Sequence, residues 1–211
     1  MSTTTSSRIE LRDRRRRRRE ESERQILDAA EGLLRERPYR DLTVDDVMAA
    51  AGQSRTAFYR HFKDRQDLVT RLLGDLAAEL FETASSWLAG SGDPLVEGRQ
   101  ATARLVDAWA PHGPLLRAIA EAASHDDEVE RVYRGLVQAF VDATVDRLRR
   151  DVAAGRAVVP DIPETASALC WMTERYLTMQ FGRPGSGDPA NAAEVLHAIW
   201  MRAVYRLDPT T

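Results

Sequence analysis

The chain has 211 residues, of which 43% are hydrophobic and 30% charged, with a net charge of −3 at pH 7; this is typical of water-soluble proteins with a core. No apolar run approaches the roughly 18 residues that a membrane span needs, and the basic N-terminus lacks the apolar segment of a secretory signal. Cys170 is the only cysteine, which excludes an intrachain disulfide and argues against a thiolate metal site. We therefore expect a cytoplasmic protein with no membrane partner.

Charge is distributed unevenly along the chain. Residues 1–65 carry 16 basic and 12 acidic side chains, whereas the remainder carries 14 and 21. A basic first third suggests that this part meets a polyanion. Six consecutive arginines, Arg14 to Arg19, predict a disordered arm over residues 1–21. This arm could reach the minor groove or the phosphates of a DNA duplex, or it could be a solvated tail without a role.

Helical periodicity dominates the first half of the chain. Apolar residues at helical spacing predict a helix over 20–37, which Pro38 ends. Thr43 then has the position of an N-cap for a short helix that closes at Gly52. A second short helix follows over about 54–60. A long helix begins near Arg65 and extends to about residue 87.

The second half shows the same pattern, with proline and glycine marking the breaks. Helices are expected over 94–109, 114–123, 125–154, 163–181 and 189–207, and the run from Pro111 to Pro114 separates the first two. No convincing alternating strand and no internal repeat occur. The expected fold is all-α, with about nine helices.

Residues 51–68, AGQSRTAFYRHFKDRQDL, gather aromatic and basic side chains directly after a glycine turn. Two short helices joined by such a turn are the ingredients of a helix-turn-helix motif. Phe58 and Phe62 are four residues apart and should fill the core, whereas Arg55 suits base edges and Tyr59 suits a phosphate. The pattern alone would also suit an amphipathic helical hairpin with no DNA partner.

The segments ILDAAEGLL (26–34), LTVDDVMAAAGQSRTAFYRHF (42–62) and RQDL (65–68) resemble the DNA-binding domain of the TetR family of one-component repressors. The resemblance implies a three-helix DNA-binding domain over 22–66 and a larger helical ligand-binding and dimerisation domain over 67–211. The partner of the first is double-stranded DNA. The predicted DNA-binding residues are Thr43, Gln53, Ser54, Arg55, Thr56, Tyr59, Arg60, His61, Lys63 and Arg65.

The segments ALCWMTERYLTMQF (168–181) and EVLHAIWMRAVY (194–205) are similar to the last two helices of a branch of this family that controls activation of the prodrug ethionamide. In that branch these helices supply a dimer interface and part of an apolar ligand channel. The implied partners are a hydrophobic or aromatic small-molecule effector and a second copy of the chain. The predicted ligand-binding residues are Trp109, Tyr133, Phe140, Cys170, Trp171, Thr173, Tyr176 and Trp200.

These features predict a homodimeric repressor that a hydrophobic ligand releases from a palindromic operator. Two recognition helices on one DNA face must lie about 34–36 Å apart, which a symmetric dimer provides. The eighth and ninth helices carry apolar stripes suited to that interface, although burial within the helix stack is an alternative.

Two other classes of function remain open. An architectural DNA-binding protein without a ligand would have a filled second domain. A helical enzyme is the less favoured class, because Glu194-x-x-His197 is only half of a di-iron site and His61, His112 and His125 show no ligand spacing. The glycine-rich stretch 182–187 follows a helix, so it is not a phosphate cradle. We expect no catalytic residue, metal site or cofactor.

Overall fold

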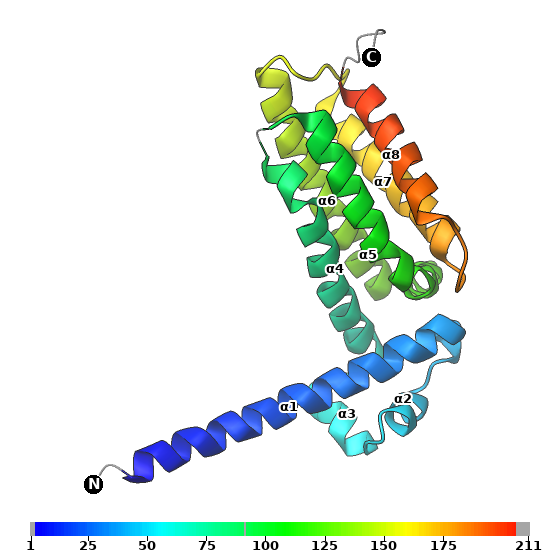
Figure 1. The fold of residues 1–211 in the computed structure, drawn as a ribbon. Helices are drawn as coiled ribbons and strands as arrows, with labels where there is room; N and C mark the ends of the chain where they lie inside the picture. The colour runs from blue at the N-terminus through cyan, green and yellow to red at the C-terminus, as the bar shows by residue number, and fades with distance from the viewer. Residues whose placement is uncertain (1–2, 91, 206–211) are drawn as a thin grey trace. The chain divides into compact units, whose positions relative to one another are not determined.

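The computed structural model describes residues 3–90 and 92–205, with side chains from Arg12 onward. Eight α-helices and one short 3-10 helix follow one another in this part of the chain (Figure 1). The described residues contain no strand, only an isolated bridge between Ala157 and Tyr205. The all-α prediction is therefore confirmed. The chain divides into two compact units between Leu72 and Leu73.

The first unit contains α1 (Thr3–Glu36), the 3-10 helix η1 (Tyr39–Asp41), α2 (Val44–Ala50), α3 (Arg55–His61) and the first turns of α4 (Arg65–Ala89). Helix α1 packs against both α2 and α3. The core between these helices is apolar and almost fully closed to solvent; its residues include Ile26, Ala30, Leu34, Val47, Phe58, Phe62 and Leu68.

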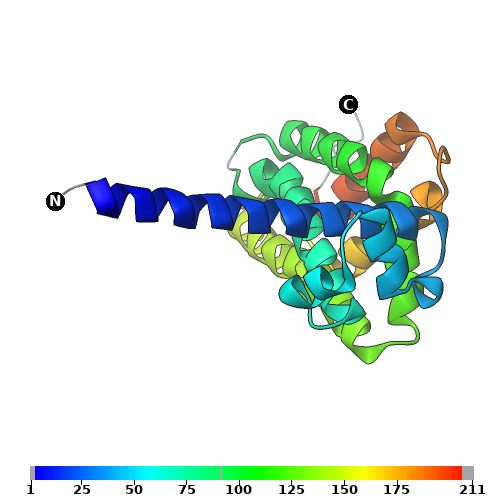
Figure 2. The same cartoon turned by 90° about the horizontal axis from the view of Figure 1, so that it is seen from below.

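Helix α1 begins much earlier than the sequence pattern indicates. We expected a disordered arm over residues 1–21 and a helix from residue 20, whereas one unbroken helix starts at Thr3 (Figure 2). Arginine and glutamate are good helix formers, and extending an existing helix needs no new nucleus. Arg16 and Glu20 also form an i,i+4 ion pair, with Nε and Oε1 3.8 Å apart. The arginine run is therefore helical in this structure.

The second unit is a bundle of the remainder of α4 with α5 (Pro94–Ala123), α6 (Asp127–Ala153), α7 (Ile162–Phe181) and α8 (Pro189–Val204). Figure 1 shows these helices side by side. Helix α5 contacts α6, α7 and α8, so it occupies a central place in the bundle.

The predicted break between helices 94–109 and 114–123 is wrong, because α5 runs through Pro111 and Pro114. The structure consequently has eight α-helices in its described part, where about nine were expected. Tertiary packing on three sides of α5 outweighs the hydrogen bonds that two prolines remove. A Cβ on Gly113 would lie 2.2 Å from the Phe181 carbonyl oxygen, so this glycine permits a close approach of α7.

Helix ends otherwise follow the capping residues closely. Asp93 caps α5 and Asp188 caps α8, each with proline in the first turn. Asp126 caps α6, since its carboxylate accepts hydrogen bonds from the amides of the first turn. The predicted end of the last helix near residue 207 lies outside the described residues, and α8 itself ends at Val204.

A buried charge cluster on α6 holds the C-terminal end of α4. Arg147, with 0% exposure, donates from Nε to Asp151 Oδ2 at 2.7 Å and from Nη1 to the carbonyls of Trp87 and Gly90. Asp151 also accepts from Tyr205 Oη at 2.6 Å. The last carbonyls of α4 therefore have fixed donors, which determines where this helix ends.

Candidate DNA-binding face and effector cavity

The turn between α2 and α3 is formed by residues with specific backbone roles. Thr43 and Asp46 form a reciprocal capping box at the start of α2, with Asp46 N donating to Thr43 Oγ1 at 3.1 Å. The Thr43 hydroxyl and Arg37 hold the pKa of Asp46 below its ordinary value. Gly52 has a φ of 65°, a conformation that other residues adopt at a cost. These features fix where α3 begins.

The core side and the outer side of α3 separate as predicted. Phe58 is fully buried and packs on Phe62, with ring centroids 5.4 Å apart. Tyr59 is 52% exposed and meets the Phe58 ring edge-on. The outer side is polar and accessible, and it carries the exposed residues Ser54, Arg55, Thr56, Tyr59 and Arg60, followed by Lys63 after the helix.

Arg55 is oriented by neighbours on both sides. Its Nη1 donates to both carboxylate oxygens of Asp45 at 2.9 Å, and its Nη2 donates to Tyr59 Oη at 3.3 Å. The bond to Tyr59, followed by the contact with Asp45, raises the pKa of Arg55 above its ordinary value. Because the Arg55 side chain remains 59% exposed, a base or phosphate can replace Asp45 as its acceptor.

Gln53 and His61 do not lie on this outer face. The Gln53 amide donates to the Ser22 carbonyl at 3.1 Å and to Gln25 Oε1 at 3.0 Å, both on α1. The His61 side chain is only 1% exposed, and its Nε2 lies 3.1 Å from Ser22 Oγ. Burial lowers the pKa of His61. Both residues were predicted to contact DNA, whereas in the structure their side chains bond to α1 and hold it against the helix-turn-helix.

Arg65 and Thr43 are also used within the protein. Arg65 donates from Nη1 to the Leu42 carbonyl, and its guanidinium carbon lies 5.1 Å from the centre of the Tyr39 ring. The Thr43 hydroxyl is taken up by the capping box. Both side chains were predicted to contact phosphate, but their hydrogen bonds now serve the fold.

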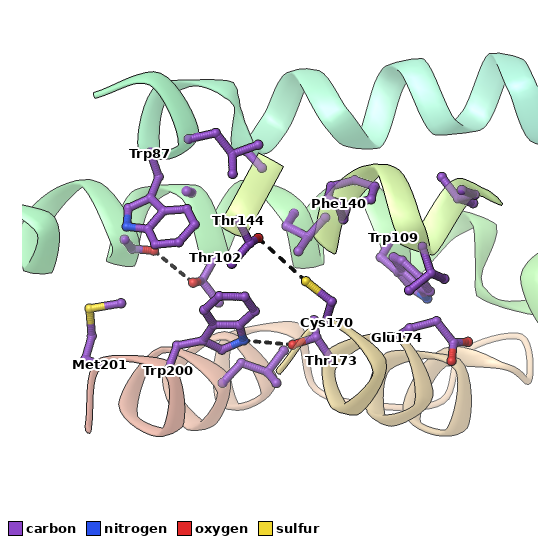
Figure 3. Close-up of a pocket in the computed structure, with 18 of the residues that line it drawn as sticks. Trp87, Thr102, Trp109, Phe140, Thr144, Cys170, Thr173, Glu174, Trp200 and Met201 are labelled. Atoms are coloured by element: carbon purple, nitrogen blue, oxygen red, sulfur yellow. Dashed lines mark hydrogen bonds between the residues drawn. The ribbon is translucent and has the colours of Figure 1, made fainter. Parts of the chain in front are cut away.

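The second unit encloses an apolar cavity of about 90 Å³ (Figure 3). Helices α4, α5, α6, α7 and α8 all contribute to its wall. Aromatic and aliphatic side chains dominate the lining, which consists of Ala84, Trp87, Leu88, Gly98, Ala101, Thr102, Leu105, Trp109, Tyr133, Leu136, Val137, Phe140, Thr144, Cys170, Thr173, Glu174, Leu196, Trp200 and Met201. A largely apolar wall with a few polar groups suits a small hydrophobic molecule.

Most polar groups in the wall already have partners. Trp200 Nε1 donates to Thr173 Oγ1 at 2.8 Å, and its ring meets Trp87 edge-on with centroids 5.7 Å apart. The Thr144 hydroxyl lies 3.6 Å from Cys170 Sγ (Figure 3). Burial raises the pKa of the Cys170 thiol to about 11, so it is an inert lining group.

Six of the eight predicted ligand residues line this cavity: Trp109, Tyr133, Phe140, Cys170, Thr173 and Trp200. Trp171 instead lines a separate surface pocket, with the Arg134 guanidinium 5.9 Å from its ring centre. One residue along a helix from Cys170, it points about 100° away. Tyr176 is half-buried and belongs to neither lining.

Several lining residues were not anticipated from the sequence. Trp87 could have been found, because it continues the apolar stripe that includes Leu76 and Leu80 on α4. Thr102 and Thr144 carry no pattern that distinguishes them from surface threonines. Glu174 was not among the predicted ligand residues, although it is 7% exposed and lines the cavity.

Neither a metal site nor a membrane-spanning helix occurs in the part of the chain that the structure describes. No group of three or more His, Cys, Asp or Glu side chains there is arranged to hold a metal ion. Among the same residues, every helix is too short or too polar to cross a bilayer.

Comparison with known proteins places both units. Residues 26–72 match the model of the bacterial regulatory proteins of the tetR family, and residues 98–206 match that of the C-terminal domain of the transcriptional regulator EthR. The HTH-type transcriptional regulator EthR of Mycobacterium tuberculosis is 29% identical over 214 residues, covering 97% of this chain and 98% of its own. The EthR of Mycolicibacterium smegmatis is 28% identical, covering 96% of each chain.

Solved structures agree on the fold. A TetR-family regulator from Syntrophomonas wolfei superposes with a TM-score of 0.75 at 14% identity, covering 87% of this chain and 95% of its own. NalD, the secondary repressor of the MexAB-OprM efflux pump in Pseudomonas aeruginosa, gives 0.69 at 23% identity, covering 89% and 98%. The family is one of regulators, not enzymes. This chain belongs to the TetR family of DNA-binding transcriptional regulators, with a C-terminal domain of the EthR type.

Proposed function

We propose that the protein is a homodimeric repressor that a hydrophobic small molecule releases from a palindromic operator. One observation carries this proposal: α4, whose first turns belong to the DNA-binding unit, also supplies Ala84, Trp87 and Leu88 to the cavity wall. A molecule in the cavity therefore touches the same helix that begins beside α3. Because α4 is one continuous helix, a movement at its cavity end can be transmitted to its first turns.

The outer side of α3 is the proposed reading surface. Arg55 can bond a guanine edge with two nitrogens, while Tyr59 and Lys63 can reach phosphates. Ser54, Thr56 and Arg60 complete the surface. The Thr43, Gln53, His61 and Arg65 side chains form hydrogen bonds within the chain and support this surface. Arg14 to Arg19 are exposed, with helical backbone, and would add phosphate contacts.

The dimer is proposed to form through α7 and α8. Large hydrophobic side chains remain exposed there, with Met179 at 72%, Val195 at 39% and Ile199 at 40%. Val195 and Ile199 are four residues apart and share one face of α8. Leu169 and Val204 belong to the apolar stripes of the same two helices but are buried within the single chain. The remaining apolar face is suited to a second copy of itself.

Release would follow from the length of α4. Its 25 residues span about 37 Å, so a small tilt at one end displaces the other by several ångströms. If the ligand-bound dimer holds its two α3 helices away from the about 34–36 Å that successive major grooves require, operator affinity falls. Such coupling is reciprocal and typically amounts to about 1–3 kcal/mol. The site of action would be the cytoplasm, where the operator lies.

The cavity also bears on the architectural alternative, since a DNA-binding protein with no ligand has no need for a hollow second unit. In this conformation the cavity is smaller than the about 300–1,000 Å³ of drug-sized sites. The effector is therefore a compact molecule, or it widens the cavity by moving Phe140 or Trp200.

A cavity-filling variant tests the proposal. Ala101 is 7% exposed and lines the cavity, so Ala101→Met should leave operator binding intact and abolish its release by apolar compounds. Ala103→Met, at a half-buried position on the same helix outside the lining, is the matched control. Fluorescence anisotropy measures operator binding and its release, with palindromic fragments of the DNA upstream of the protein's own gene and with or without apolar compounds. Release that persists in Ala101→Met would contradict the proposal, as would indifference of the wild type to every palindrome at moderate salt.

A further inference from the structure

One end of the cavity carries a carboxylate, whereas a buried indole N–H without an acceptor among the described residues occurs at both ends, in Trp109 and in Trp87. Trp109 on α5 and Glu174 on α7 lie toward this end, while Trp87 and Met201 lie toward the other (Figure 3). Trp109 is 6% exposed and Glu174 is 7% exposed. These two side chains bring a hydrogen-bond donor and a carboxylate to a largely apolar wall.

The indole nitrogen of Trp109 is a buried donor without an acceptor. Within the described part of the chain, no oxygen or nitrogen accepts from Trp109 Nε1. The hydroxyls around the cavity do not have this deficit: Thr102 donates to the Gly98 carbonyl at 2.8 Å, and Thr173 accepts from Trp200. Leaving a buried donor unpaired destabilises the protein. An acceptor supplied from outside the chain would remove that cost.

Glu174 is a buried carboxylate with spare acceptor capacity. Its Oε1 accepts from the Tyr133 hydroxyl and, at 2.8 Å, from Thr178 Oγ1. No described arginine or lysine forms a salt bridge with it, and no described donor bonds to Oε2. A carboxylate accepts about four hydrogen bonds when ionised. Burial, and then the negative charge of Glu174, raise the pKa of Tyr133 above its ordinary value, so this phenol stays a donor.

The Glu174 carboxylate is also reachable from outside. Glu174 and Tyr133 line both the cavity and the surface pocket that contains Trp171. Two arginines line that pocket. Arg134 is engaged by Glu130, with Nε and Oε1 2.7 Å apart, and the exposed Arg175 forms no salt bridge with Glu174. A ligand can therefore meet the carboxylate where the two hollows share a wall.

These observations define a chemical class. Burial of an unpaired carboxylate is costly, and a cation with its own hydrogen-bond donors is its best partner. We infer that the effector is a compact apolar amine, whose protonated nitrogen binds Glu174 while an acceptor atom next to that nitrogen receives the Trp109 indole N–H. This inference rests on the proposed function only in taking the cavity as the effector site.

Matched probes separate charge from shape. Titration calorimetry on the full-length protein compares phenethylamine with phenethyl alcohol, which has the same shape and no charge, and with phenylacetate, an anion. The amine should bind the wild type at least tenfold more tightly than either. Equal affinities, tighter binding of the alcohol or the anion, or no binding of the amine at millimolar concentration would overturn the inference.

Two variants assign the preference to the named side chains. Glu174→Gln keeps an oxygen for Tyr133 and Thr178 but removes the charge, so it should lose the preference for the amine and retain its affinity for the alcohol. Glu121→Gln, an exposed carboxylate on α5, is the control and should keep the preference. In the wild type, phenylethanolamine should bind more tightly than phenethylamine, because its hydroxyl supplies an acceptor next to the amine nitrogen. Trp109→Phe should abolish this difference. A preference that survives in either cavity variant would refute the role of that residue.

The DNA readout distinguishes this inference from the function on which it rests. Release of the operator by neutral apolar compounds, without any advantage for the amine, would refute the amine class and leave a ligand-released repressor. Tight binding of the amine that depends on Glu174, with operator affinity unchanged, would support the site and refute release as its consequence.

Discussion

Two buried polar clusters in the second unit have opposite surroundings. Around Arg147 and Asp151, donors and acceptors come from α6, from the last carbonyls of α4 and from Tyr205. The one Arg147 nitrogen without a hydrogen bond among the described residues belongs to a guanidinium whose carbon lies 5.2 Å from the Trp87 ring centre. At the cavity, Glu174 forms no salt bridge and Trp109 Nε1 finds no acceptor among the residues that the structure describes.

The difference separates framework from receptor. A buried charge that the chain itself satisfies fixes a helix end, and removing one partner exposes the full desolvation cost of the other. A buried group that the chain leaves open is costly until something else satisfies it. The same distinction divides the DNA-binding unit, in which Gln53, His61 and Arg65 bond inward and Arg55 and Tyr59 remain accessible.

The largest expected effect lies in the satisfied cluster. Asp151→Asn keeps the size of the side chain but leaves the buried Arg147 charge without its carboxylate, and it should lower the free energy of unfolding by about 3–5 kcal/mol. Urea titration followed by circular dichroism measures this change. Asp146→Asn, which alters an exposed i,i+3 pair with Arg149 on the same helix, should cost under about 1 kcal/mol. Equal losses in the two variants would show that the cluster is not a framework element.

A smaller change in free energy is expected on the outer side of α3, where it concerns operator binding and not stability. Arg55→Ala should weaken operator binding by about 1–3 kcal/mol and relax the sequence preference at one position in each half-site, because a bidentate base contact is lost. Arg131→Ala, an exposed arginine on α6 paired only with Glu128, should leave both unchanged. Fluorescence anisotropy against a set of single-base operator variants measures affinity and preference together. A uniform loss over all variants would instead assign Arg55 to a phosphate.

Burial of His61 predicts a pH dependence that is confined to the first unit. Its pKa in the folded state lies below the 6.5 of an exposed imidazole, chiefly because of desolvation, while the nearby Glu23 opposes the shift. Below pH 6.5 the unfolded chain therefore takes up a proton that the folded chain does not, and stability falls as the pH decreases. Protection of α1 and α3 amides from hydrogen exchange should decline between pH 7.5 and about 5.5.

The matching variant and control are both conservative. His61→Gln can keep a bond to Ser22 and has no proton to gain, so it should remove most of this decline. His125→Gln, at an exposed position in the second unit, should not alter it. A decline of the same size in wild type and His61→Gln would assign the pH dependence to other groups.

Features set by residues close together in the sequence could be predicted from it, whereas features set by contacts between distant residues could not. Local features were predictable: the capping box of Thr43, the glycine turn at Gly52 and the burial of Phe58 each depend on residues within one or two turns. The continuity of α5 through Pro111 was not, because packing against three other helices decides it. The same holds for the inward position of His61, which is set by Ser22, 39 residues away.

The candidate sites divide in the same way. Aromatic residues such as Phe140 and Trp200 could be assigned to the cavity from helix periodicity and family resemblance together. The charge of Glu174 could not, because its significance lies in the lack of a salt bridge to any arginine of the described helices. A helical pattern states which face a residue occupies, but not whether the neighbouring helices satisfy it.

The smallest effect on stability is expected at Glu174, and it tests the comparison most directly. Glu174→Gln retains an oxygen that accepts from Tyr133 and Thr178, and it removes a buried charge that forms no salt bridge. The weaker hydrogen bonds and the lower cost of burial should nearly cancel in the free energy of unfolding. The free energy of unfolding should change by less than about 1 kcal/mol, against the much larger loss in Asp151→Asn. Both variants replace a buried carboxylate by its amide, so urea titrations compare them on equal terms. A loss of unfolding free energy in Glu174→Gln as large as in Asp151→Asn would mean that this carboxylate also stabilises the fold and is not a binding group for a cation.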